Sequence, residues 1–230
     1  MIFVTGDVHC PIDISKLNSK NFRKQRELTK NDNLIVCGDM GLVWSNPCNK
    51  GYNEDVYWQK WFNTRNYTTL FIDGNHENHP VLNRYPIVNI YGGRAHQIKE
   101  TVFHLMRGEI YTINGRTFYC FGGAASHDKH LRKEGVDWWP EEEATYDEMC
   151  HGVENLEKHK YNVDYIISHD GPKQVVESMV GWGVAPNTTN KYLDFLSKNV
   201  RFKGWYFGHH HDDIDLGLYH MLYDRVIELD

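Results

Sequence analysis

The sequence is poor in cysteine and has no paired-cysteine motif. Its five cysteines are odd in number and widely spaced across 230 residues, and none lies in a CxxC pair. This pattern argues against a disulfide framework and against a cysteine-rich zinc site. No apolar run approaches the roughly 18 residues that a membrane-spanning helix needs, and the first residues lack the basic and long apolar regions of a signal peptide. We therefore expect reduced thiols in a cytoplasmic protein without a membrane partner.

Basic residues are also scarce. The chain carries 25 lysines and arginines against 31 aspartates and glutamates, a formal net charge of −6, which argues against a broad basic surface for duplex nucleic acid. It also lacks the GxSxG nucleophile elbow and the GxxxxGK[ST] phosphate loop. Hydrophobic residues make up 40% of the chain and no linker interrupts it. We expect a single globular domain over residues 1–230. The sequence does not indicate its oligomeric state.

A short apolar run that stops at a polar residue, in most cases after a glycine, recurs five times along the chain. Continuous apolar runs of this length are typical of strands that are buried on both faces. In α/β sheets, sites form at the carboxyl ends of such strands, so we expect the polar residues to meet at one edge. The five runs are residues 2–4, 34–37, 70–72, 165–167 and 205–207.

Helical and hairpin patterns separate these runs. Apolar residues at helical spacing predict helices over residues 54–66, 141–159 and 188–199. The second of these follows Pro140 and three acidic residues, which suit the first turn of a helix. Asn114-Gly115 between residues 110–113 and 117–121 predicts a β-hairpin. The pattern therefore indicates a mixed fold, with a buried sheet, helices and antiparallel strands in the middle.

The polar residues at the predicted strand ends form one set of metal-binding types. Two carboxylates, four imidazoles and one amide suit a divalent ion such as Zn, Mn or Fe. Seven side chains exceed one tetrahedral site but suit two ions that share a bridging ligand. The set consists of Asp7, His9, Asp39, Asn75, His169, His209 and His211.

Each member of this set also has an ordinary structural explanation. Asp39 and Asn75 are residue types that favour turns, and the run 209–211 could be a surface patch that binds metal adventitiously. Along an extended strand His209 and His211 face one way and His210 the other. We therefore leave His210 out of the expected ligands.

The ordered motifs resemble those of calcineurin-like metallophosphoesterases. That resemblance implies a β-sandwich of two mixed sheets flanked by helices, in four αββα layers. Residues 122–141 are similar to the small bacterial and phage members of the family. The motifs are Asp7-Val8-His9, Gly38-Asp39, Gly74-Asn75-His76-Glu77, Ser168-His169 and Gly208-His209-His210-His211.

The resemblance also implies a ligand set and a mechanism. Asp39 would bridge two divalent ions, with Mn expected and Fe, Zn, Ni or Mg also compatible. A hydroxide shared by the ions would attack phosphorus in line, and His76 would act at the leaving-group oxygen as general acid or charge stabiliser. One ion would be held by Asp7, His9, Asp39 and His211, and the other by Asp39, Asn75, His169 and His209.

The substrate expectation rests partly on a departure from the wider family. The protein Ser/Thr phosphatase branch has a phosphate-binding arginine shortly after the aspartate that matches Asp39, and the sequence 40–44 here has none. We expect a small or nucleotide-type phosphoester, contacted by Asn75, His76 and Arg132, without distinguishing monoesters from diesters. The alternatives are a Ser/Thr phosphoprotein phosphatase and a non-catalytic, metal-stabilised binding scaffold.

Overall fold

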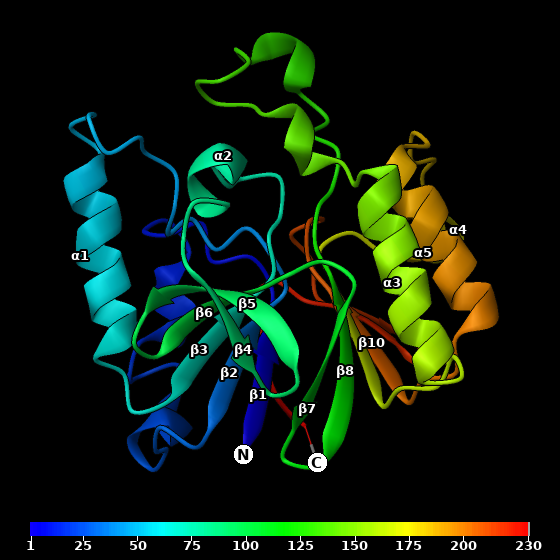
Figure 1. The fold of residues 1–230 in the computed structure, drawn as a ribbon, viewed down its shortest axis with the longest axis horizontal. Coiled ribbons are helices and arrows are strands. Elements are labelled where there is room, and N and C mark those ends of the chain that lie inside the picture. Colours follow the sequence, from blue (N-terminus) through cyan, green and yellow to red (C-terminus); the bar gives the residue numbers. More distant parts are fainter. Residues whose placement is uncertain (230) are drawn as a thin grey trace.

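The computed structural model describes residues 1–229 and consists of two β-sheets packed face to face, with helices on both outer sides (Figure 1). Ile35 of one sheet and Phe118 and Ile167 of the other belong to one buried cluster between the sheets. Separate clusters lie between each sheet and its helices. The expected sandwich of four layers is therefore confirmed, whereas the residue pattern alone had indicated one buried sheet.

The first sheet contains seven strands. Its central strands run parallel, and antiparallel strands complete both edges. In spatial order the strands are β13 (Val226–Leu229), β1 (Ile2–Thr5), β2 (Asn33–Val36), β3 (Thr68–Phe71), β6 (Val102–Leu105), β5 (Gly93–Lys99) and β4 (Ile87–Ile90).

The second sheet contains six strands, of which β12, β10, β9 and β8 run parallel. The predicted hairpin is confirmed as its β7–β8 pair. In spatial order the strands are β11 (Ile214–Leu216), β12 (Tyr219–Met221), β10 (Gly204–Phe207), β9 (Tyr165–Ser168), β8 (Arg116–Phe121) and β7 (Glu109–Ile113).

Helices cover the outer face of each sheet. Phe62 of α1 packs into the cluster of the first sheet, and Leu156 of α3, Val176 of α4 and Leu193 of α5 pack against the second. None of the helices within residues 1–229 is long and apolar enough to cross a membrane. The helices are α1 (Tyr52–Asn63), α2 (His79–Leu82), α3 (Tyr146–Lys158), α4 (Lys173–Val180) and α5 (Thr188–Asn199), with 3-10 turns at Ile14–Leu17, Arg23–Arg26, Lys129–Leu131 and Pro140–Glu142.

The bounds of α5 match the prediction, but the helix predicted over residues 141–159 begins later. The acidic residues after Pro140 form only a 3-10 turn, and α3 starts after Thr145. The Thr145 side chain accepts a bond from the Glu148 backbone N–H at 3.3 Å, and the Glu148 carboxylate accepts one from the Thr145 N–H at 2.8 Å. These reciprocal bonds form a capping box, which fixes the start of the helix at that point.

All five predicted strands exist, and their carboxyl ends meet at one edge of the sandwich. Strands β1, β2 and β3 end there in the first sheet, and β9 and β10 end there in the second. The long segment between β8 and α3 (green) rises above this edge (Figure 1). The polar residues after the five strands therefore come together from both sheets, beneath a covering loop.

Candidate metal centre

The backbone turns sharply where the strands end. His9, Asp39, His209 and His211 all have positive φ values, of 39°, 47°, 69° and 52°. Residues other than glycine rarely adopt this left-handed conformation, and such residues cluster at functional sites. Strand alternation was therefore the wrong reason to set His210 apart from its neighbours. The structure separates it by a hydrogen bond instead, between His210 Nε2 and Asp170 Oδ1 at 2.9 Å.

Asp39 lies at the centre of the cluster. Its Oδ2 is 3.1 Å from His9 Nε2, and its Oδ1 is 3.2 Å from His169 Nε2. The same Oδ1 accepts a hydrogen bond from the backbone N–H of His76 at 2.8 Å. Burial alone would raise the pKa of Asp39, but the neighbouring His169 and His9 hold that pKa well below the usual carboxyl range. The Asp39 carboxylate is therefore ionised and shared between two groups of imidazoles.

Asp7 forms the second acidic position. Its Oδ1 is 3.5 Å from His169 Nδ1 and its Oδ2 is 3.5 Å from His211 Nε2. Both oxygens also accept from the backbone N–H of His209, at 3.1 and 3.0 Å. Burial, assisted by the charge of Asp39, raises the pKa of Asp7. The carboxylates of Asp7 and Asp39 thus share the site, and both are buried.

His169 joins the two carboxylates to the remaining side chains. Its Nε2 is 3.1 Å from Asn75 Oδ1, its Nδ1 is 2.7 Å from the carbonyl oxygen of Cys37, and its ring centroid is 5.0 Å from that of His209. Although burial lowers the pKa of His169, Asp39 and Asp7 raise it to about 10. Burial lowers the pKa of His209 well below its ordinary value, which keeps that imidazole neutral.

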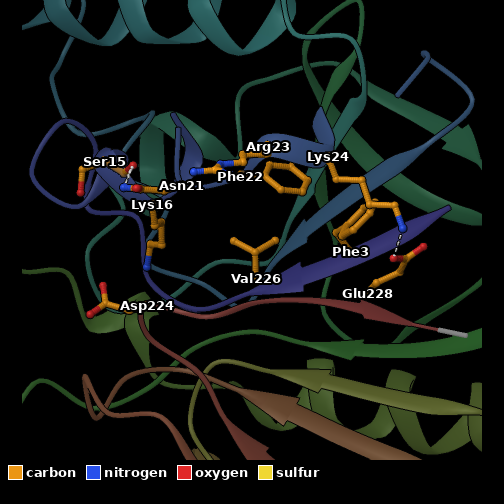
Figure 2. Close-up of a pocket in the computed structure, with 10 residues that line it drawn as sticks. All are labelled: Phe3, Ser15, Lys16, Asn21, Phe22, Arg23, Lys24, Asp224, Val226 and Glu228. Carbon is orange, nitrogen blue, oxygen red and sulfur yellow. Dashed lines mark hydrogen bonds and ion pairs between the residues drawn. The ribbon is translucent and has the colours of Figure 1, made fainter. Parts of the chain in front are cut away.

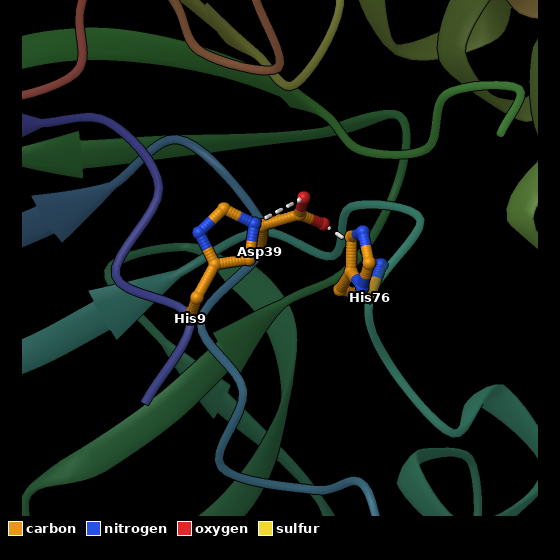
Figure 3. A group of neighbouring side chains, drawn as sticks. All are labelled: His9, Asp39 and His76. Carbon is orange, nitrogen blue, oxygen red and sulfur yellow. Dashed lines mark hydrogen bonds and ion pairs between the residues drawn. The ribbon is translucent and has the colours of Figure 1, made fainter. Parts of the chain in front are cut away.

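Two groups of potential metal ligands overlap at Asp39. Ligand atoms of His9, Asp39 and His76 lie within 4.8 Å of one another, as do those of Asp39, His169 and His209. Figure 3 shows the first group, with the Asp39 carboxylate between the two imidazoles. A third group contains Asp170, His209 and His210. The structure therefore brings all seven residues of the predicted set together, through contacts that centre on Asp39 and Asp7.

The donor set fits divalent cations. Asp7 and Asp39 are at most 1% exposed, and buried carboxylates need a positive partner. Without bound metal, a protonated imidazole is that positive partner. The carboxylates raise the pKa of His9 to about 9, although burial lowers it. Neutral imidazole and carboxylate ligands together suit transition-metal ions. A Cβ atom at Gly208 would lie 2.3 Å from Asp7 Oδ1, and one at Gly74 would lie 2.1 Å from Asp39 Oδ1, so both glycines are needed at these positions.

His76 lies at the rim of the centre. Its ring stacks on Trp44 with centroids 5.9 Å apart and an interplanar angle of 28°, and it contacts His9 edge-on at 5.1 Å. Its Nε2 is 3.4 Å from Nη2 of Arg132, whose Nε donates to Asp128 at 2.7 Å. Burial lowers the pKa of His76. The loop between β8 and α3 thus places Arg132 beside the imidazole of His76, which is the predicted catalytic histidine.

Several supporting residues were missed by sequence reasoning. Asp13 Oδ2 is 2.8 Å from His9 Nδ1, and the Ser126 hydroxyl accepts a bond from Asn75 Nδ2 at 3.2 Å. Nothing in the sequence marks either residue. The Glu77 carboxylate accepts from the backbone N–H groups of Met40 at 2.7 Å and Gly74 at 2.6 Å. Glu77 therefore ties together the loops that follow β2 and β3.

A separate pocket lies away from these ligand groups. It has a volume of about 590 Å³ and is lined by β1 and β13 residues and by the two first 3-10 turns (Figure 2). An ion pair between Lys24 and Glu228 crosses its rim. None of the groups of potential metal ligands described above lies in it. This pocket therefore offers no candidate metal site.

The fold of this chain is similar to that of solved structures. A solved structure of a putative 5'-nucleotidase from Staphylococcus aureus in complex with alpha-ketoglutarate is similar with a TM-score of 0.52 and 16% identity, over 96% of this chain and 48% of that one. The sulfate thiohydrolase SoxB of Thermus thermophilus, in complex with glycerol, is similar with a TM-score of 0.41 and 14% identity, over 84% of this chain and 33% of that one. This chain thus covers half or less of both structures. No curated protein matches the sequence.

The sequence profile of the calcineurin-like phosphoesterases matches residues 1–213, which include every residue of the cluster. Members of this family act on phosphoesters with the help of divalent metal ions, and the chain offers His and Asp groups that could hold them. The protein described here belongs to the calcineurin-like phosphoesterase family.

Proposed function

We propose that the protein hydrolyses small or nucleotide-type phosphoesters with two divalent cations held at the strand ends. The observation that carries this proposal is the place of Asp39, whose Oδ2 lies 3.1 Å from His9 Nε2 and whose Oδ1 lies 3.2 Å from His169 Nε2. One cation would be held by Asp7, His9, Asp39 and His211, and the other by Asp39, Asn75, His169 and His209. Mn²⁺ is the cation we propose first.

The bound cations would activate a water molecule and neutralise the oxygens of the phosphoryl group. Neighbouring residues orient the side chains that would hold the cations. Asp13 orients the His9 imidazole through its Nδ1, and the carbonyl of Cys37 does the same for His169. Partners of this kind fix the tautomer and direction of a ligand imidazole.

His76 is the proposed general acid. Its imidazole stacks on the Trp44 ring, and the backbone N–H of His76 donates to Asp39 Oδ1. From there the imidazole would donate a proton to the leaving-group oxygen, where negative charge builds up as the ester bond breaks. Arg132, 3.4 Å from the His76 ring nitrogen, would contact a phosphoryl oxygen of the substrate.

The proposal is tested with protein loaded with Mn²⁺. Hydrolysis of p-nitrophenyl phosphate, or of its bis-ester, is expected, and His76→Ala should lower kcat by about 10²- to 10⁴-fold while it retains the metal. His159→Ala is the matched control, because His159 is exposed at the end of α3. Metal binding without any hydrolysis across a panel of phosphoesters would favour the scaffold alternative. Turnover confined to Ser/Thr phosphopeptides would favour the protein phosphatase alternative.

A further inference from the structure

A pocket of about 370 Å³ opens beside the candidate metal centre. His9 and His76 form the end that touches the centre, and Trp44 and Trp58 are the largest side chains of its wall. Its position places it next to the proposed general acid. A group bonded to phosphorus through the oxygen that His76 protonates would therefore extend into this pocket.

The aromatic wall is held rigidly. Trp44 stacks on His76 and meets Trp139 edge-on, with centroids 5.2 Å apart at 87°. Trp58 comes from α1 and packs edge-on against Trp61 at 5.8 Å. Rigid aromatic surfaces bind planar groups by stacking with little loss of conformational freedom.

The pocket is also acidic. Glu54 and Asp55 line it, and no lysine or arginine of the described chain does. The Asp55 carboxylate accepts from the backbone N–H groups of Trp44 at 3.0 Å and Ser45 at 2.7 Å, so it fixes the Trp44 loop against α1. Glu54 lies in the exposed first turn of α1. At the end away from His9, these two carboxylates have no lysine or arginine beside them and disfavour a negatively charged group of the occupant.

We propose that this pocket binds the leaving group of the phosphoester and that it selects a planar, uncharged group of the nucleoside class. This inference rests on the proposed function, which places the phosphoryl group at the strand ends. It names nucleoside monophosphates as the preferred substrates. Esters whose leaving group carries a carboxylate or a further phosphate are disfavoured by Glu54 and Asp55.

The first test measures binding without catalysis. Adenosine should quench the tryptophan fluorescence of the metal-free protein, whereas ribose should not. Trp58→Ala should abolish most of this binding, and Trp58→Phe should retain part of it because the ring is kept. Trp182→Ala is the matched control, because Trp182 is 68% exposed and lies outside the pocket.

The second test uses the Mn²⁺ form. Trp58→Ala should lower kcat/KM for adenosine monophosphate on the order of ten-fold more than for glycerol phosphate. Glu54→Gln should raise kcat/KM for phosphoglycolate relative to adenosine monophosphate by about two- to five-fold.

The two tests separate the failure of this inference from the failure of the proposed function. If adenosine binding depends on Trp58, nucleoside binding in the pocket is supported. If no ester is hydrolysed in that case, only the proposed function fails. If esters are hydrolysed but adenosine does not bind, the inference is overturned. Equal losses for both substrates in Trp58→Ala would overturn it as well.

Discussion

His169 Nε2 lies 3.2 Å from Asp39 Oδ1, although the two residues follow strands of different sheets. Asp39 follows β2 and His169 follows β9, so this contact joins the two halves of the sandwich at the candidate metal centre. It also explains the low pKa of Asp39 and the high pKa of His169, because the opposite charges stabilise each other. A substitution of Asp39 should therefore weaken metal binding by the ligands of both sheets.

Asp39→Asn should lose most of the Mn²⁺ that the parent protein binds, because it weakens both ligand groups at once. His9→Gln should weaken chiefly one of them and leave the other bound. Metal content after gel filtration, measured by atomic emission, distinguishes the two variants. Asp147→Asn, at an exposed position of α3, should bind as the parent does. Equal metal loss in the Asp39 and His9 variants would contradict a shared ligand.

Arg132→Ala should lower kcat/KM for phosphomonoesters by about ten-fold or more, since a charge-assisted contact to a phosphoryl oxygen is lost. The metal content should not change, because Arg132 contacts His76 and none of the proposed ligands. Steady-state kinetics of Arg132→Ala and of Lys133→Ala test this. Lys133 is the exposed neighbour in the same loop. Equal effects of the two substitutions would mean that the loop acts only through its overall charge.

Arg107→Met should lower the free energy of unfolding by about 3–5 kcal/mol, because the buried carboxylate of Asp73 loses the guanidinium and keeps the contact with His104 Nε2, at 3.1 Å. Arg107 Nε donates to Asp73 Oδ2 at 2.9 Å, and both side chains are less than a tenth exposed. Arg94→Met removes a partner of Glu109 from a half-exposed position and should cost about 0–1 kcal/mol. Urea unfolding measures both, and similar costs would contradict this account of the buried pair.

The contribution of His79 should lower the free energy of unfolding of the metal-free protein as the pH falls from about 6.5 to about 4. Burial lowers the pKa of His79 from 6.5 to about 4, so within this window the unfolded chain binds a proton that the folded chain does not. The destabilisation that His79 causes is on the order of 3 kcal/mol when the pH has fallen to about 4. It is absent above pH 6.5, the ordinary pKa of histidine. Its Nε2 is buried without a hydrogen-bond partner in the described chain.

His79→Leu removes this titration and should flatten the fall in stability. Unfolding of both proteins at pH 7, 6 and 5 in EDTA measures the difference, and EDTA removes any effect of bound metal. An unchanged slope in His79→Leu would show that His79 is protonated in the folded protein.

The sequence predicts the strands and the edge at which they end, because both depend on local patterns. Continuous apolar runs indicated all five strands, and the pattern of residues 188–199 gave both ends of α5. The division of these strands between two sheets follows from long-range pairing. For example, β1 pairs with β13 across the whole chain, and short apolar runs carry no information about that pairing.

The supporting contacts of the candidate centre were also beyond sequence reasoning. The left-handed backbone of His209 and His211 replaces the extended geometry that was expected for residues 209–211. Glu77 and Arg107 act through main-chain atoms and side chains that lie more than 30 residues away. Such contacts depend on the tertiary fold. A single sequence does not indicate which distant residues come into contact.

The crystal structure of the protein grown with Mn²⁺, with anomalous difference maps at a wavelength near the Mn absorption edge, tests the central proposal most directly. We predict two peaks, one between Asp7, His9, Asp39 and His211 and the other between Asp39, Asn75, His169 and His209. A single peak, or peaks that do not share Asp39, would contradict the proposed centre.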